Sequence, residues 1–181
     1  HFVLTGGSKR GWTAWLTAAV DNRVTAIAPI VSDLLNMRRS FAHHWSCYGF
    51  WAEALGPYEE MGIFDWFDTL QAQTLLDMVD PYEYRDNLNI PKLIITAAGD
   101  DFFIHDSIQF YLDDLPGETY VRTMPNTNHY LDGAMEEVFA NMAPYYDAFL
   151  LGQSRPQFTW TLNGDGSTTV QTTTPPLAVY L

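Results

Sequence analysis

The chain has 181 residues, a formal net charge of −13 and 47% hydrophobic residues, which is enough apolar material for the core of one domain. The excess of negative charge argues against a nucleic-acid partner, because phosphate binding requires a basic surface. Cys47 is the single cysteine, so an internal disulfide is excluded, and no apolar stretch approaches the length of a membrane span.

The first residues form a short apolar run that leads through two glycines into Ser8 and then into a helical pattern over 9–20. A tight strand-to-helix turn of this kind is typical of a nucleophilic serine, whose hydroxyl then stands clear of the backbone. The helix N-terminus carries partial positive charge, so the Lys9 N–H is the expected oxyanion donor. The usual spacing is G-x-S-x-G, whereas here Arg10 replaces the second glycine and Gly11 follows it. Taken alone, the segment is equally consistent with an ordinary glycine-rich turn.

A buried strand is predicted at 24–31, with Pro29 marking its end because proline interrupts strand pairing. No strand of comparable strength is predicted within 33–89, a segment rich in aromatic residues. A long insertion here is expected to form a cap that excludes water and shapes a pocket. Most of its aromatics are expected to form the cap's own core, while two or three face Ser8 as an apolar or sugar-stacking wall. The substrate-binding candidates are Arg10, Trp45, Trp51 and Trp66.

Another buried strand, predicted at 92–97, leads into two aspartates. The carboxyl ends of parallel strands are where open α/β sheets hold their sites. Asp100 is the preferred acid because it comes directly off the strand, and Asp101 is the alternative. His129 is the predicted base, since the other four histidines lie too early in the chain or too close to the acids. The order Ser8, Asp100, His129 matches the order of nucleophile, acid and base in α/β-hydrolases.

The rest of the chain continues the alternation of helices and strands. We predict a short helix at 106–115 with Asp106 as its N-cap, a strand at 118–124, a helix at 132–150, a hairpin over 156–173 and a short strand at 177–180. Strands separated by helices predict a parallel sheet with right-handed crossovers.

We therefore expect a partial α/β-hydrolase domain over residues 1–152, with the cap at about 33–89, and the beginning of a β-sandwich-like accessory domain over 153–181. Because the first predicted strand runs straight into Ser8, the chain is expected to be a fragment. The strands expected before it would supply the second oxyanion N–H.

Four segments together resemble the PhoPQ-activated pathogenicity-related protein family, which includes the autocrine proliferation repressor proteins. The segments lie at 5–13, 99–103, 110–117 and 125–129, in the family's order, and the resemblance covers nearly the whole chain. It implies the C-terminal half of an α/β-hydrolase followed by a β-rich region, in a secreted or periplasmic protein. It implies little about the substrate. The G-x-S-x-x-G spacing is also similar to that of glucuronoyl esterases, which place a basic residue, here Lys9, directly after the serine.

The expected activity is acyl transfer from an ester or amide to water, with an ester preferred. His129 would take the Ser8 proton while Asp100 holds the imidazole tautomer. The side chain of Lys9 or Arg10 would add charge at the oxyanion or bind an acidic substrate. The alternative is a secreted signalling or binding protein on a catalytically silent hydrolase scaffold.

The expected substrate is a small-molecule, carbohydrate or peptide ester, and the sequence does not define an oligomeric state. No cofactor is expected. No metal is expected either, because His43 and His44 are adjacent and the carboxylates are scattered along the chain.

Overall fold

The computed structural model describes residues 1–177 of a chain that forms two compact units, His1–Met142 and Ala143–Leu181. The first unit contains a four-stranded sheet, and the second contains a two-stranded antiparallel hairpin. The short strand predicted at 177–180 lies outside the described residues except for Leu177. Within the described part, none of the helices combines the length and apolar character needed to cross a lipid bilayer.

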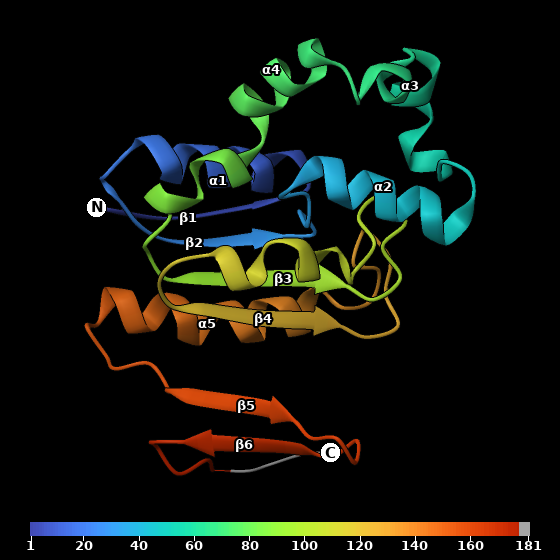
Figure 1. Ribbon diagram of the computed structural model, residues 1–181. Helices are drawn as coiled ribbons and strands as arrows, with labels where there is room; N and C mark the ends of the chain where they lie inside the picture. The colour runs from blue at the N-terminus through green and yellow to red at the C-terminus, as the bar shows by residue number, and fades with distance from the viewer. Residues whose placement is uncertain (178–181) are drawn as a thin grey trace. The chain divides into compact units, whose positions relative to one another are not determined.

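The four strands of the first unit are parallel, as predicted, and the structure shows them side by side in chain order (Figure 1). They are β1 (Phe2–Gly7), β2 (Val24–Ile30), β3 (Lys92–Ala97) and β4 (Thr119–Met124). Because parallel strands require crossover connections, their carboxyl ends all meet at one edge of the sheet. The loops that follow β1, β3 and β4 therefore approach one another at that edge.

Helix α1 (Lys9–Val20) has the bounds that the apolar spacing predicts, and it supplies one side of the main core. Its Trp15 is completely buried in a cluster that includes Ile27 of β2 and Ile94 of β3. Its Ala18 and Ala19 are small enough to bring the helix close to the sheet. This packing holds the first turn of α1 in place beneath the loop that carries Ser8.

The prediction that Pro29 ends its strand is wrong. Pro29 lies inside β2, opposite Gly6 of β1, and the strand continues to Ile30. The N–H groups of Ile27 and Val31 donate toward β3, to Pro91 and Ile95 carbonyls, so position 29 also faces that side. A proline there removes one bond of the β2–β3 ladder and leaves the β1–β2 ladder intact.

The predicted cap forms entirely from helices between β2 and β3. Its elements are α2 (Met37–Tyr48), η1 (Glu53–Leu55), α3 (Gly56–Glu60), η2 (Ile63–Trp66), α4 (Leu70–Val79) and η3 (Pro81–Asn87). Figure 1 shows α3 and α4 rising away from the sheet in an arc and η3 returning the chain to the layer of α1.

One buried carboxylate joins the start of this cap to the end of α4. Asp80, at the end of α4, accepts hydrogen bonds from the N–H groups of Asn36 and Met37 at 3.2 and 2.7 Å, where the cap begins. It also accepts from the N–H of Tyr82 at 3.0 Å and so caps η3. Burial raises the pKa of Asp80 to about 6, although the three N–H donors oppose that rise. The end of α4 is therefore tied to the segment with which the cap begins.

The segment after β3 departs from the prediction of one helix over 106–115. It forms two short 3₁₀ turns, η4 (Ser107–Phe110) and η5 (Leu112–Asp114), separated by Tyr111 in a non-helical conformation with φ of −150°. Asp106 precedes η4 but makes no side-chain cap, because its carboxylate bonds to His43 instead. A tertiary contact here overrides the local capping preference.

The remaining elements follow the prediction closely. Helix α5 (Met135–Leu150) starts three residues later than expected, after a turn in which Gly133 has φ of +76°. The hairpin of the second unit consists of β5 (Phe158–Leu162) and β6 (Thr168–Thr172).

Candidate active site

Ser8 occupies a sharp turn between β1 and α1. Its backbone has φ of 55° and ψ of −124°, a conformation that side-chain-bearing residues rarely adopt. Its N–H donates to the Ile30 carbonyl at 2.9 Å, and its carbonyl accepts from the Trp12 N–H at 3.1 Å. Backbone bonds on both sides thus hold the strained residue, as expected for an elbow that presents a reactive side chain.

The unusual glycine spacing has a steric basis. A Cβ on Gly6 would lie 2.4 Å from the Arg10 carbonyl oxygen, and one on Gly11 would lie 2.6 Å from the Ser32 Cβ. A Cβ on Gly7 would meet nothing within 4 Å. The tight approaches therefore fall at positions 6 and 11, so the turn tolerates Arg10 where the common motif has glycine.

We expect Gly6→Ala to destabilise the folded protein by about 1–3 kcal/mol, because the backbone must shift to relieve the overlap. Gly7→Ala is the matched control and should change stability much less, since its Cβ would enter open space. Urea unfolding of the two variants measures the difference. Equal losses would contradict this account of the turn.

The His129 side chain lies within hydrogen-bonding distance of the Ser8 side chain on one side and of the Asp100 side chain on the other. The His129 Nε2 is 2.9 Å from the Ser8 Oγ, and the His129 Nδ1 is 2.9 Å from the Asp100 Oδ2. These residues follow β1, β4 and β3 respectively, so three separate loops converge. Asp100 and His129 are buried, and Ser8 is partly exposed. This arrangement has the connectivity needed to move a proton from a serine hydroxyl to an imidazole.

The two aspartates after β3 occupy different environments. The second oxygen of Asp100 accepts hydrogen bonds from the N–H groups of Phe102 and Phe103, at 2.8 and 3.0 Å. These bonds fix the carboxylate while its other oxygen faces His129. Asp101 is exposed, and its side chain takes no part in these contacts. The geometry therefore favours Asp100 over Asp101 as the partner of His129.

Lys9 and Arg10 are the first residues of α1, and both are exposed. The N–H groups in the first turn of a helix have no intrahelical partner, so the Lys9 N–H is available for an oxyanion beside Ser8. Lys9 also lines the cavity described next, whereas Arg10 does not.

An apolar cavity of about 150 Å³ opens beside Ser8, under the cap. Among the residues that line it are cap aromatics and two phenylalanines from the acid loop: Phe41, Phe64, Phe67, Phe102 and Phe103. Phe102 and Phe103 are not among the site residues expected from the sequence. Their rings also lie 5.0 and 5.9 Å from the His129 ring, centroid to centroid, so they form a wall shared by cavity and base. Their place directly after the acid was the available signal.

The three tryptophans named from the sequence lie elsewhere. Trp45 and Trp51 line a different hollow of the cap, together with Arg38. Trp51 stacks on Phe64 with 3.8 Å between ring centroids and 19° between planes, so it supports the cavity wall from behind. Trp66, at the end of η2, lines neither hollow.

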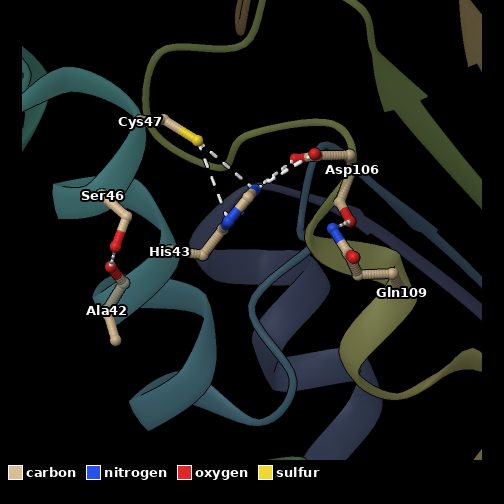
Figure 2. Close-up of polar contacts among 6 residues, drawn as sticks. All are labelled: Ala42, His43, Ser46, Cys47, Asp106 and Gln109. Carbon is tan, nitrogen blue, oxygen red and sulfur yellow. Dashed lines mark hydrogen bonds and ion pairs between the residues drawn. The ribbon is translucent and has the colours of Figure 1, made fainter.

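A polar cluster attaches the cap to the acid loop (Figure 2). The His43 Nε2 lies 2.9 and 3.1 Å from the two carboxylate oxygens of Asp106. The Cys47 Sγ, one turn later on α2, lies 3.5 Å from the same nitrogen. Because Asp106 and Asp100 belong to one loop, this contact couples the position of α2 to that of the acid.

Asp33 is a buried carboxyl group that sequence reasoning missed. It follows β2, and among the described residues no partner reaches hydrogen-bonding geometry with either of its oxygens. Burial raises its pKa to about 8; the nearby Tyr111 hydroxyl opposes this rise, and the charge of Asp100 adds to it. The raised pKa favours the neutral acid over the carboxylate near pH 7. Nothing in the local sequence distinguishes it from a solvated loop aspartate.

Within residues 1–177, no three histidine, cysteine, aspartate or glutamate side chains are grouped so that they could hold a metal ion.

Solved structures with a similar fold include hydrolases. The acetyl xylan esterase from Paenibacillus sp. R4 superposes with a TM-score of 0.55 and 22% identity, over 77% of this chain and 44% of that one. The acylaminoacyl peptidase of Pyrococcus horikoshii superposes with a TM-score of 0.54 and 19% identity, over 81% of this chain and 23% of that one. At these identities the likeness shows the fold, which is that of the α/β-hydrolases.

Two sequence comparisons identify the family. Autocrine proliferation repressor protein A of Dictyostelium discoideum is 38% identical over 162 residues, which cover 88% of this chain and 33% of that protein. The chain thus spans about a third of the length of this relative. The sequence pattern of the PhoPQ-activated pathogenicity-related proteins matches residues 1–181. The chain therefore belongs to the PhoPQ-activated pathogenicity-related protein family.

Proposed function

We propose that this chain carries the catalytic residues of a serine hydrolase that cleaves a carboxylic ester. The observation that supports this most strongly is the pair of 2.9 Å contacts linking Ser8 to His129 and His129 to Asp100. In this mechanism His129 takes the Ser8 proton as the serine attacks the ester carbonyl. The Lys9 N–H donates to the oxyanion, and Asp100 stabilises the imidazolium. His129 then protonates the departing alcohol, and water releases the acyl group by the reverse steps.

An ester is preferred to an amide because the wall beside Ser8 is apolar, whereas a peptide backbone would require polar partners there. The like-folded structures include both an esterase and a peptidase, so the fold is compatible with either reaction.

A fluorophosphonate that modifies activated serines tests this proposal on the natural full-length protein. We expect one label per chain, located at Ser8 by peptide mass spectrometry, and no label in Ser8→Ala. Ser46→Ala is the matched control: this exposed serine on α2 donates to the Ala42 carbonyl, outside the site, and its variant should label fully (Figure 2).

A second candidate is a secreted regulatory protein whose hydrolase site is silent. The name of the Dictyostelium relative, an autocrine proliferation repressor, favours it. Absence of fluorophosphonate labelling in a folded full-length protein would support this candidate and contradict the first.

A further inference from the structure

The cavity beside Ser8 begins at the proposed nucleophile and is enclosed by the cap. Ser8, Lys9 and Trp12 form one side of it, and residues of α2, α3, η2 and α4 form the other. Trp51 supports the wall from outside by stacking on Phe64, and within the wall Phe41 meets Phe67 edge to face at 5.6 Å. The space is thus preformed and requires little ordering when a ligand binds.

The chemistry of the walls selects hydrocarbon. Apolar atoms make up nearly all of the lining surface, and the polar side chains of Lys9 and Tyr58, which also line the cavity, contribute little of it. The indole N–H of Trp12 is already bonded to the Val79 carbonyl at 2.7 Å, and the Ser8 hydroxyl faces His129. A sugar ring placed here would lose its hydrogen bonds to water without replacing them, which is unfavourable. The apolar alternative for the cap wall is therefore favoured over the sugar-stacking one.

The position of the base indicates which half of the ester lies in the cavity. His129 must deliver a proton to the leaving alcohol, so the alcohol lies on the side of the imidazole. His129 is not among the residues that line the cavity, whereas Ser8 and Lys9 are. Beside Ser8 the cavity is thus lined by the oxyanion side, Lys9, and it approaches the imidazole only through Phe102 and Phe103, which is the arrangement expected for the acyl half of the ester.

We propose that the cavity is an acyl pocket, and that the substrates are esters of uncharged apolar acids of short chain length or with a single phenyl ring. The cavity measures about 150 Å³, and an apolar cavity of about that size accommodates benzene in another protein. This inference rests on the hydrolase function proposed above.

A series of 4-nitrophenyl esters tests the proposal on the full-length protein, since the leaving group stays constant. From acetate through butanoate to hexanoate, we expect kcat/KM to rise about fourfold per methylene until the cavity is filled. The hemisuccinate has the same number of carbons as butanoate but ends in a carboxylate. It should react at least about tenfold more slowly, because that charge would be buried among apolar groups.

Two residues of α4 provide a matched pair of variants. Leu75 lines the cavity, whereas Leu70 is 83% exposed and does not. Leu75→Trp should lower the hexanoate-to-acetate ratio of kcat/KM at least about tenfold, because the indole occupies the space of the acyl chain. Leu70→Trp should retain the wild-type ratio. Leu75→Ala should move the preferred acyl length upward, and thermal melting checks that each variant is folded.

The outcomes separate the two proposals. A flat or falling dependence on acyl length overturns the acyl pocket if Ser8 is labelled and acetate is hydrolysed, and the hydrolase function then stands. The acyl pocket is also overturned if kcat/KM depends on the length of the alcohol in a series of alkyl acetates and not on the length of the acyl group. The cavity would then hold the alcohol. A folded protein that neither labels at Ser8 nor hydrolyses any ester overturns the hydrolase function and this inference with it.

Discussion

Asp100→Asn is expected to lower kcat for ester hydrolysis about 10⁴-fold, by analogy with the loss of the buried acid in other serine hydrolases. The asparagine can still accept hydrogen bonds from the Phe102 and Phe103 N–H groups through its oxygen. Its amide nitrogen then faces the His129 Nδ1, which favours the tautomer that carries its proton on Nε2. That tautomer cannot accept the Ser8 proton. Single-turnover kinetics with a 4-nitrophenyl ester measures the loss.

Asp101→Asn is the matched control, because Asp101 is the next residue, carries the same charge and is exposed. Its kcat should stay within about threefold of wild type, as is usual for a screened surface charge. The reverse result, a large loss at 101 and a small one at 100, would identify Asp101 as the acid and contradict the site described above.

The second large effect concerns the dependence of stability on pH, and Asp33 is its source. The folded-state pKa of about 8 lies above the ordinary value of 3.8. Between these values the folded protein retains a proton that the unfolded chain has released, so this group lowers stability as the pH rises. The loss of stability begins near the lower pKa, is complete above the upper one, and has an upper limit of about 6 kcal/mol. Asp33→Asn removes this loss of stability, because the asparagine amide is neutral at every pH in this range.

We therefore expect wild type and Asp33→Asn to have similar unfolding free energies at about pH 4, and the variant to be the more stable by several kcal/mol at about pH 9. The two proteins must be compared at each pH, because Lys92 makes stability change with pH in the opposite direction to Asp33. Burial lowers its pKa to about 8, so its contribution to stability rises with pH above that value. Asp86→Asn, at an exposed carboxylate of η3, is the control. Parallel pH profiles for wild type and Asp33→Asn would contradict the assignment of a neutral buried acid.

Much of the architecture could be predicted from the sequence, because its signals are local. The bounds of α1 follow from apolar residues at helical spacing between Ser8 and Asp21. The parallel direction of the strands follows from their separation by helical segments, and the approach of Ser8, Asp100 and His129 to one another follows from the position of each after a strand. Each of these inferences needs a pattern of only a few neighbouring residues.

The predictions that failed or stayed open depend on contacts between distant segments. The local sequence predicts that Asp106 caps a helix, but its carboxylate instead bonds to His43, which lies 63 residues earlier in the chain. The local sequence predicts that Pro29 ends its strand. The strand continues because residue 29 faces β3, so the proline costs one bond of the β2–β3 ladder and none of the β1–β2 ladder. Trp45 and Trp51 are as aromatic as Phe41 and Phe64, and only the path of the cap decides which rings face Ser8.

The attachment formed by Asp80 has a consequence for how changes in the cap affect the site. A segment whose start is tied to the end of α4 by two hydrogen bonds from backbone N–H groups to the Asp80 carboxylate can change in length and composition without displacing the strands on either side. The proposed catalytic residues and the larger part of the cavity wall therefore lie in different stretches of the polypeptide. Replacing the segment between residues 36 and 80 would change that part of the wall while leaving Ser8, Asp100 and His129 in place.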